Sequence, residues 1–425
     1  MPEVIKIEGG HRLNGEVTIS GSKNATVALI PAAVLANGPV TIVGVPEIAD
    51  VRNLAEILKI LNVQVDQPHV DHLIIDPTHM QNVDLLDDAV TKLRASYYFM
   101  GALLGKYHHV RMKMPGGCYL GPRPIDLHLK GFEALGATVK YEKGCFEIDA
   151  DELVGDKIFL DISSVGATIN IMMAAVYAKG RTTIENAARE PEIIDVATLL
   201  NKMGAHIRGA GTNVITIDGV TSLSGCFHEI IPDRIEAGTY IIIAAAMAEK
   251  MKINNVIPHH LEALLSKLEE MGVDMDVTVD SVTVRHKDHL HAVDVTTRPY
   301  PGFATDLQQP LTSLMTQAEG DSHVEETIYV ERFKHCEQLC RMGANIDVHQ
   351  GEAVIHGPTP LYGTKVAATD LRCGAAMVVA GLLAEGTTTI SNIYHIDRGY
   401  DHIDDKLNAL GAKVWREKVA DDEED

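Results

Sequence analysis

Met203-Gly204-Ala205 stands at the end of an apparent helix, and the same small motif recurs five more times along the chain. Glycine is the middle residue in five of the six copies, which suits a helix C-terminal cap where a left-handed residue is needed. The steps between the first residues of successive copies are 74, 68, 68, 71 and 68 residues. The other copies are Leu61-Asn62-Val63, Leu135-Gly136-Ala137, Met271-Gly272-Val273, Met342-Gly343-Ala344 and Leu410-Gly411-Ala412.

A second motif, a polar turn that opens an apolar helix rich in alanine, stands 36 to 41 residues before each cap. Two motifs that hold register over six copies predict six repeats, each with an apolar helix, a strand, an amphipathic helix and a strand. The six turns are Gly21-Ser22-Lys23-Asn24-Ala25, Lys92-Leu93-Arg94-Ala95-Ser96, Ser164-Val165-Gly166-Ala167-Thr168, Asp233-Arg234-Ile235-Glu236-Ala237, Ala304-Thr305-Asp306-Leu307-Gln308 and Thr369-Asp370-Leu371-Arg372-Cys373.

The two kinds of helix predict where each lies in the fold. Residues 169–177 are apolar on most faces of a helix, which places such a helix in the interior. Residues 51–58 have apolar side chains on one helical face only. We therefore predict an α/β fold with helices inside and sheets outside, the reverse of the common layered arrangement. A chain of 425 residues exceeds one core, so we expect two domains of three repeats each.

Composition excludes several classes of function. A net charge of -22 does not suit nonspecific binding to a nucleic acid. The longest apolar run, residues 240–248, is too short to span a membrane, and residues 1–6 do not resemble a signal peptide. The six cysteines show no C-x-x-C spacing, so we expect no metal site and a cytoplasmic, reducing location. The acidic residues 420–425 are interpreted as a solvated terminus.

Cations recur at the turns that open the apolar helices. Lys23, Arg94, Arg234 and Arg372 stand there, and helix N-termini attract anions. For any single one of these residues an ordinary surface position is an equally good interpretation. For the four cations taken together, an anion-binding site is the better interpretation. An anionic ligand of an acidic protein needs a local basic cluster, and these four residues could form one.

Residues 114–124 contain three glycines and three prolines, which indicates a loop. Cys118 lies in this loop near Lys113 and Arg123, so we predict an accessible thiol with a perturbed pKa. The alternative, a buried and inert cysteine, is the interpretation for the other cysteines considered. These are Cys145, Cys226, Cys336 and Cys340.

Asp306 stands where other repeats carry a cation or a serine, so it is a candidate to deprotonate a hydroxyl group. A helix N-cap formed by Thr305 or Asp306 is an equally good interpretation, and Asp370 has the same ambiguity. The histidine runs at 69–72, 107–109 and 258–260 are interpreted as solvated loops, because they lack the spacing of metal ligands.

Several blocks resemble the UDP-N-acetylglucosamine 1-carboxyvinyltransferases, which catalyse the first committed step of peptidoglycan synthesis. The resemblance covers nearly the whole chain except the acidic tail, and its blocks fall in order. They are Ser20-Gly21-Ser22-Lys23-Asn24-Ala25, Pro115-Gly116-Gly117-Cys118, Gly121-Pro122-Arg123-Pro124-Ile125-Asp126-Leu127-His128, Glu185-Asn186-Ala187-Ala188-Arg189-Glu190-Pro191-Glu192, Pro232-Asp233-Arg234-Ile235-Glu236 and Tyr394-His395-Ile396-Asp397-Arg398-Gly399-Tyr400.

The resemblance implies two inside-out α/β domains, each a pseudo-threefold array of βαβαββ units. Residues 24–231 would form one domain, and residues 1–23 with 232–425 the other. The implied substrates are phosphoenolpyruvate and UDP-N-acetylglucosamine, with no metal and no organic cofactor. The oligomeric state stays open.

The resemblance also implies roles for single residues. Cys118 would be the general acid, would form a covalent adduct with phosphoenolpyruvate and would be the target of fosfomycin. Asp306 would be the base for the attacking 3′-hydroxyl, with Asn24 beside it. Residues implied to hold phosphoenolpyruvate are Lys23, Asn24, Arg123, Arg332, Arg372 and Arg398, and Lys23 and Arg398 would also be catalytic. Residues implied to contact the nucleotide sugar are Arg94, Arg123, Pro124, Ile125, Asp126, Leu127, Ser164, Val165, Gly166, Asp306 and Ile328.

One departure from the family is Ile162, where some members carry a lysine, and it puts one diphosphate contact in doubt. Two alternatives remain. One is the enolpyruvyl transferase of the shikimate pathway, and the other is a catalytically silent paralogue that binds the nucleotide sugar. The Gly116-Gly117-Cys118 loop speaks against the first, and retention of Lys23 and Asp306 speaks against the second.

Overall fold

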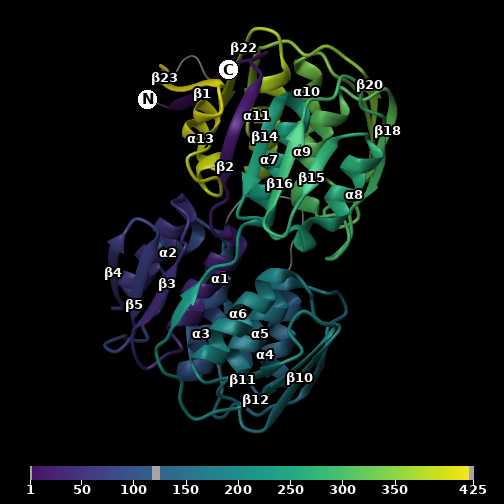
Figure 1. The fold of residues 1–425 in the computed structure, drawn as a ribbon. Coiled ribbons are helices and arrows are strands. Elements are labelled where there is room, and N and C mark those ends of the chain that lie inside the picture. Colours follow the sequence, from purple (N-terminus) through teal and green to yellow (C-terminus); the bar gives the residue numbers. More distant parts are fainter. Residues whose placement is uncertain (1, 117–124, 421–425) are drawn as a thin grey trace. The chain divides into compact units, whose positions relative to one another are not determined.

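The computed structural model describes residues 2–116 and 125–420, and Figure 1 shows the path of the chain. This part of the chain divides into two compact units. Unit 1 contains residues 2–20 and 232–420, and unit 2 contains residues 21–116 and 125–231. Each unit has its own hydrophobic core.

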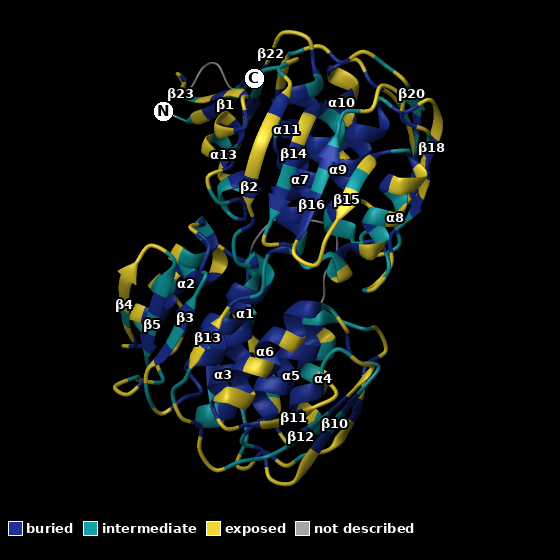
Figure 2. Cartoon of the chain, viewed as in Figure 1, coloured by how far each residue is buried: buried dark blue, intermediate teal, exposed yellow. Residues whose placement is uncertain are grey.

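Three apolar helices form the core of each unit, and they are the dark blue helices of Figure 2. In α5, ten of the eleven residues are buried, as expected for a helix that is apolar all round. Figure 2 also shows that exposed residues gather on the outer strands and loops, which confirms the prediction of helices inside and sheets outside. The inner helices are α1 (Lys23–Ala33), α3 (Tyr98–Tyr107) and α5 (Val165–Ala175) in unit 2, and α7 (Arg234–Met247), α9 (Thr305–Met315) and α11 (Leu371–Leu383) in unit 1.

Small residues allow the inner helices to pack with their backbones close together. A Cβ at Gly101 of α3 would lie 2.4 Å from the backbone oxygen of Asn170 in α5, and one at Gly105 would lie 2.7 Å from that of Met173. These glycines therefore set the distance between the two helices.

The second helix of each repeat is amphipathic and ends in the cap that the sequence predicted. The residue after each C-cap has a φ between 56° and 111°, as expected of the left-handed conformation. At Gly204 the amide donates to the carbonyl of Asn201 and the next amide to that of Leu200, which is a Schellman motif. The helices are α2 (Ala49–Ile60), α4 (Asp126–Ala134), α6 (Pro191–Lys202), α8 (Glu262–Glu270), α10 (Lys334–Arg341) and α13 (Ile403–Ala409).

One sheet covers each repeat from outside, and the order β11-β12-β10-β9 in unit 2 shows the pattern. The strand that follows the apolar helix, here β10, pairs with a parallel edge strand and with an antiparallel hairpin. Buried residues alternate along these strands, so one face lies against the helices. The strands of unit 2 are β3 (Val40–Val43), β4 (Gln64–His69), β5 (His72–Asp76), β6 (His109–Lys113), β7 (Thr138–Glu142), β8 (Cys145–Asp149), β9 (Lys157–Phe159), β10 (Arg181–Glu185), β11 (His206–Arg208), β12 (Val214–Asp218) and β13 (Phe227–Glu229).

Unit 1 repeats this pattern, and its last sheet takes a strand from the start of the chain. Strand β1 lies between β22 and β23 and pairs antiparallel with both. The strands of unit 1 are β1 (Glu3–Glu8), β2 (Leu13–Thr18), β14 (Ala248–Asn254), β15 (Asp274–Val277), β16 (Ser281–Arg285), β17 (Asp294–Thr296), β18 (Gly320–Glu325), β19 (Asn345–His349), β20 (Glu352–Gly357), β21 (Lys365–Ala367), β22 (Thr387–Ser391) and β23 (Lys413–Lys418).

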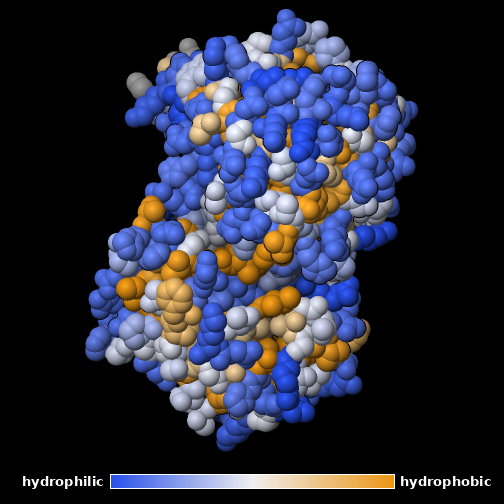
Figure 3. Space-filling model, in the orientation of Figure 1, coloured by the Kyte–Doolittle hydropathy of each residue, from blue (hydrophilic) through white to orange (hydrophobic). Residues whose placement is uncertain are grey.

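Short helical turns complete the two units, and the surface drawn in Figure 3 is largely hydrophilic, as expected for the outward faces of such sheets. Among the described residues, no helix combines the length and the apolar character needed to cross a membrane. The short turns are η1 (Asp88–Thr91), η2 (Arg94–Tyr97), η3 (Pro258–Leu261) and α12 (Tyr394–Asp397).

Candidate functional site

The N-terminus of α1 carries the first group of candidate residues. Ser22 caps the helix, since its Oγ accepts from the amide of Ala25 at 3.1 Å. Lys23 follows, and its Nζ lies 3.8 Å from the buried carboxylate of Asp50 at the start of α2. The lysine side chain is only 15% exposed, and Asn24 beside it is half-buried. A half-buried amine at the positive end of a helix suits an anionic ligand.

The N-terminus of α5 forms a second group within unit 2. Ser164 caps this helix through the amide of Ala167, and Val165 is its first residue. A Cβ at Gly166 would lie 2.4 Å from Oη of Tyr97, so only glycine fits here. The turn 164–166 is therefore held against Tyr97, at the end of η2.

A buried histidine joins this turn to α4 and to Arg94. The ring of His128 lies 4.7 Å from that of Tyr97, and the guanidinium of Arg94 lies 5.8 Å from the Tyr97 ring centre. Nδ2 of Asn170 donates to Nδ1 of His128 at 2.9 Å, which leaves the ring proton on Nε2. Burial, and then the charge of Arg94, lower the pKa of His128 to about 3, so its ring is neutral near pH 7.

His128 is the third residue of α4, and Ile125, Asp126 and Leu127 precede it at the start of that helix. The structure thus brings the starts of α4 and α5 together with Arg94. Three segments distant in sequence, residues 94–97, 125–128 and 164–166, therefore contact one another in unit 2.

In unit 1 the carboxylate of Asp306 lies between two buried arginines. Nη1 of Arg332 donates to Oδ1 of Asp306 at 2.9 Å, and Nη2 of Arg372 donates to Oδ2 at 3.4 Å. The side chains of Arg332 and Arg372 are 4% and 3% exposed, whereas that of Asp306 is 25% exposed. The site therefore holds two buried guanidinium groups beside one partly exposed carboxylate.

Aromatic rings cover the two arginines. Burial disfavours the charged form of each arginine and so lowers its pKa. At Arg332 the negative charge of Asp306 acts in the opposite direction, and the pKa of Arg332 is raised overall. Burial lowers the pKa of Arg372, but Tyr400 and then Asp306 raise it more, so this pKa is also raised overall. The Arg332 guanidinium lies 5.5 Å from the ring centre of Tyr329, and that of Arg372 lies 5.4 Å from Tyr400.

Arg398 and Ile328 complete the candidate residues that the structure describes in unit 1. Arg398 is half-buried and ends α12, and its charge contributes, after burial, to the lowered pKa of His395. Ile328 is 36% exposed, and its amide donates to the carboxylate of Glu326 at 3.0 Å.

The structure settles two alternatives that the sequence left open. The N-cap of α9 is Ala304, without a side-chain hydrogen bond, so the N-cap interpretation of Thr305 and Asp306 is wrong. Asp370 is an N-cap, because its carboxylate accepts from the amides of Arg372 and Cys373. Lys23, Arg234 and Arg372 do open helices, whereas Arg94 opens the turn η2 just before α3.

Two further expectations need correction. Cys336 is buried, but Cys340 is exposed and Cys145 and Cys226 are half-buried, because they lie on the outer layer of their units. The histidines at 69, 72 and 109 lie in strands rather than loops.

Three of the predicted residues, Cys118, Arg123 and Pro124, lie outside the described residues. The sequence argument missed Asp50, Tyr97, Asn170 and Glu326. His128 closes one of the family-like blocks, which was the available signal for it. The others contact the candidate residues only through the tertiary structure.

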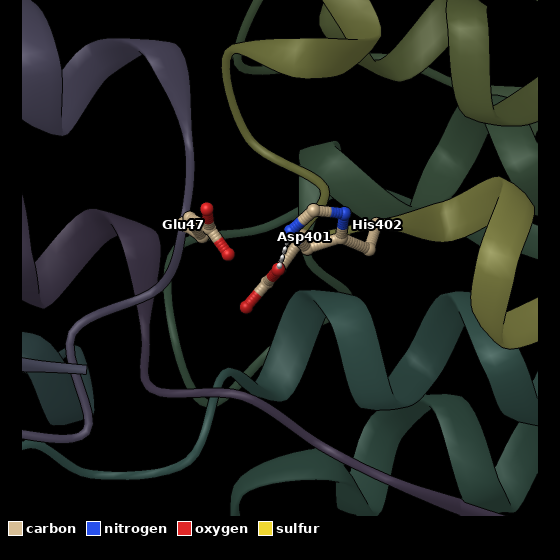
Figure 4. Close-up of side chains that lie close together, drawn as sticks. All are labelled: Glu47, Asp401 and His402. Carbon is tan, nitrogen blue, oxygen red and sulfur yellow. Dashed lines mark ion pairs between the residues drawn. The ribbon is translucent and has the colours of Figure 1, made fainter. Parts of the chain in front are cut away.

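Polar clusters elsewhere could be mistaken for metal sites. Nδ1 of His109 lies 2.5 Å from Asp149, with Glu147 close by, but all three are partly exposed. Figure 4 shows Asp401 and His402 in the segment before α13, where Nε2 of His402 lies 3.7 Å from Asp401 Oδ1. Oγ of Ser20 donates to the same carboxylate at 3.1 Å. Such ion pairs are ordinary surface features.

Comparisons with known proteins identify proteins that share the fold and the sequence family of this chain. A family model described as EPSP synthase (3-phosphoshikimate 1-carboxyvinyltransferase) matches residues 7–407. Among solved structures, the enolpyruvyl transferase NikO from Streptomyces tendae superposes with a TM-score of 0.90 at 28% identity, covering 99% of this chain and 100% of that one. An EPSP synthase from Acinetobacter baumannii, at 17% identity and a TM-score of 0.75, covers 98% of this chain and 100% of its own and shares the fold.

Relatives of known name are far more similar in sequence. UDP-N-acetylglucosamine 1-carboxyvinyltransferase 2 of Geobacillus kaustophilus is 57% identical over 419 residues, which is 99% of this chain and 98% of that protein. The protein of the same name from Bacillus subtilis is 56% identical over 422 residues, with the same coverage. The resemblance inferred from the sequence blocks is confirmed, and the chain belongs to the UDP-N-acetylglucosamine 1-carboxyvinyltransferase family.

Proposed function

We propose that this chain transfers the enolpyruvyl group of phosphoenolpyruvate to the 3′-hydroxyl of UDP-N-acetylglucosamine and releases inorganic phosphate, the first committed step of peptidoglycan synthesis. The observation that carries the proposal is the 57% identity, over 99% of the chain, to a relative that bears this name. The small-molecule substrates are both anions, which suits the half-buried and buried cations of the candidate site.

Phosphoenolpyruvate would be held by several cationic side chains. Lys23 and Arg398 would bind its phosphate together with Arg123, and Arg332 and Arg372 would bind its carboxylate. A buried arginine with a fixed orientation is suited to planar anions, because its N–H groups match two oxygens at once. Asn24, next to Lys23, would contribute a polar contact.

The nucleotide sugar would contact unit 2 where residues 94–97, 125–128 and 164–166 meet. Arg94 would face the diphosphate, and the N-terminus of α5, which follows its N-cap Ser164, would present the backbone N–H groups of Val165 and Gly166 to it. Pro124, Ile125, Asp126 and Leu127 would contact the uridine, and Ile328 is a further proposed contact of the nucleotide sugar.

The reaction would proceed by addition and elimination. Asp306 would take the proton of the 3′-hydroxyl, whose oxygen then bonds to C2 of phosphoenolpyruvate, while Cys118 gives a proton to C3. Loss of a proton from C3 and of phosphate from C2 of the tetrahedral ketal would restore the enol ether. The arginines beside Asp306 would stabilise the charge that develops on the substrate.

Other parts of the proposal follow from the family. Residues 24–231 and residues 1–23 with 232–425 would be the two functional domains, and the two compact units support this division. No metal or organic cofactor enters the scheme. The cytoplasm is the proposed location, since free cysteines such as Cys336 persist in a reducing compartment. Neither the shikimate-pathway acceptor nor a silent paralogue is favoured by any observation.

The test follows inorganic phosphate when the purified protein is mixed with phosphoenolpyruvate and UDP-N-acetylglucosamine, with Cys118→Ser alongside. We expect release that depends on both substrates and is lost or strongly reduced in the variant. Release with 3-phosphoshikimate in place of the nucleotide sugar would contradict the acceptor. Nucleotide-sugar binding without turnover by the wild type would support the silent paralogue instead.

Fosfomycin gives a second test of the same thiol. If Cys118 has the proposed role, fosfomycin should add covalently to it and abolish phosphate release. An intact mass without the adduct after incubation would contradict the assigned role of Cys118.

A further inference from the structure

Glu326 has a buried carboxylate just after β18, and an unusually large number of hydrogen-bond donors surrounds it. The residue is 2% exposed, yet its two oxygens accept five hydrogen bonds. Each carboxylate oxygen can accept more than one hydrogen bond, so the two oxygens serve all five donors. The donors are Oγ1 of Thr297 (2.7 Å), Oγ1 of Thr305 (2.9 Å), Nε2 of Gln308 (3.2 Å) and the amides of Ile328 (3.0 Å) and Tyr329 (3.1 Å).

These bonds divide between the two oxygens in a way that connects two elements. Oε1 accepts from Thr297 and from the amides of Ile328 and Tyr329, so it fixes the loop after β18. Oε2 accepts from Thr305 and Gln308, so it fixes the first turn of α9. The same carboxylate therefore sets that loop against the helix that carries Asp306.

A chain of hydrogen bonds continues from Glu326 to Asp306. Oγ1 of Thr305 donates to Glu326 and accepts from Nη1 of Arg332 at 3.0 Å. The same Nη1 donates to Asp306 at 2.9 Å. Nε2 of Gln308 also donates to the backbone oxygen of Arg332 at 3.0 Å, so the arginine is held at both its backbone and its side chain.

We propose that Glu326 is a positioning residue for the transfer reaction, which orients Arg332 and Asp306 through Thr305 and Gln308. The inference rests on the function proposed above, because it assigns those two residues to the reacting groups. Glu326 itself touches neither substrate in this scheme. Its effect is to keep the guanidinium and the carboxylate in one mutual geometry before the substrate arrives.

Glutamine cannot replace Glu326 without loss, although it has the same shape. Its amide has one acceptor oxygen and one donor nitrogen. If the oxygen faces the amides of Ile328 and Tyr329, the nitrogen faces Nε2 of Gln308, and two donors then meet. If the oxygen faces Thr305 and Gln308, two backbone donors lose their buried acceptor, which costs free energy.

The experiment compares Glu326→Gln with Glu325→Gln, a matched change one residue earlier on an exposed side chain. We measure kcat and KM for both substrates in the wild type and in each variant, with thermal unfolding alongside. A displaced reacting group costs about 100-fold, so we expect kcat of E326Q to fall about 10- to 100-fold. KM for phosphoenolpyruvate should rise, because Arg332 is a proposed contact of its carboxylate, whereas KM for UDP-N-acetylglucosamine should change less than about threefold. E325Q should keep the kcat of the wild type.

A double-mutant cycle separates positioning from a merely structural role. Thr305→Val removes the hydroxyl that links Glu326 to Arg332 and serves as a second route if E326Q folds poorly. Because both changes interrupt one chain, kcat of the double variant should be no lower than that of the worse single variant. Multiplicative losses in the cycle, or a kcat of E326Q equal to that of E325Q, would overturn the inference. A wild-type protein that releases no phosphate would overturn the proposed function first.

Discussion

Asp306 shows how a single carboxylate gains its proposed role from its neighbours. From the sequence, Asp306 was equally well a base or an N-cap, and the N-cap is excluded because Ala304 occupies that position. The arginines that decide between the roles, Arg332 and Arg372, lie 26 and 66 residues farther along the chain. No local pattern could reveal that they meet at one carboxylate.

Asp306→Asn provides the test of this assignment. The amide cannot take a proton from the hydroxyl, so we expect kcat for phosphate release to fall by about 100- to 10,000-fold. Binding of UDP-N-acetylglucosamine, measured by calorimetry, should weaken far less, because Asp306 is only one of its proposed contacts. A variant that retains wild-type kcat would remove Asp306 as the base.

Two buried histidines predict a loss of stability in acid. Burial lowers the pKa of both His128 and His335 to about 3, whereas each has an ordinary value near 6.5 when unfolded. Between these values the unfolded chain binds more protons than the folded one, so stability falls as the pH falls. Each histidine should contribute a slope of up to about 1.4 kcal/mol per pH unit between pH 6.5 and 3.

Urea unfolding at several pH values checks this prediction. His335→Gln should have a smaller slope of unfolding free energy against pH than the wild type. His349→Gln, on an exposed histidine, should have the same slope as the wild type. Equal slopes in all three proteins would show that His335 is protonated in the folded state.

At the scale of single elements, the caps were the most predictable part of the chain. A left-handed residue after the amphipathic helix requires glycine or asparagine, and this need shows directly in the sequence. The amphipathic helices were predicted from the helical spacing of their apolar residues, and the strands that follow were predicted from their position just after each cap. The residue pattern alone did not reveal the short parallel edge strands, such as β9 and β13, because three residues carry no readable alternation, although the βαβαββ units implied by the resemblance include four strands.

Gly204 allows a clean test of the cap, since a Cβ there would meet no atom closer than 3.9 Å. Gly204 has a φ of 111°, a backbone conformation that is unfavourable for alanine. Gly204→Ala should therefore lower the free energy of unfolding by about 1–2 kcal/mol. Gly38→Ala is the matched control, because that glycine has no left-handed φ and its Cβ would find an ordinary contact at 3.7 Å. Equal stability of the two variants would show that the cap geometry is not what requires glycine.

At the scale of the whole chain, the six repeats were visible but their closure was not. In the other repeats the last two strands form a hairpin, as β7 and β8 do across Lys143 and Gly144. In the sixth repeat the corresponding strands are β23 and β1, from opposite ends of the described chain. Counting caps along the sequence cannot reveal this, because residues 3–8 precede the first cap by more than fifty residues.

The pairing of β1 with β23 predicts that the chain tolerates circular permutation. Glu3 pairs with Lys418, and the amide of Val419 donates to the carbonyl of Pro2 at 3.0 Å, so these residues lie where a hairpin turn would join the strands. Figure 1 shows β1 and β23 side by side in this sheet. A short glycine-containing turn from Val419 to Pro2 should therefore close the sixth repeat without strain.

The permutant needs new ends where the chain can be opened, and the exposed turn between Lys143 and Gly144 provides them. We expect this protein to unfold within a few degrees of the wild type and to keep its phosphate-release activity. The matched control is the same joined chain opened between Ala376 and Met377, inside the buried helix α11, which should fail to fold. A parent chain that ends at Val419 separates any effect of removing the acidic tail. If the permutant opened at 143–144 unfolds while that shortened parent is stable, then a turn cannot join β23 to β1 as it joins the two hairpin strands of the other repeats.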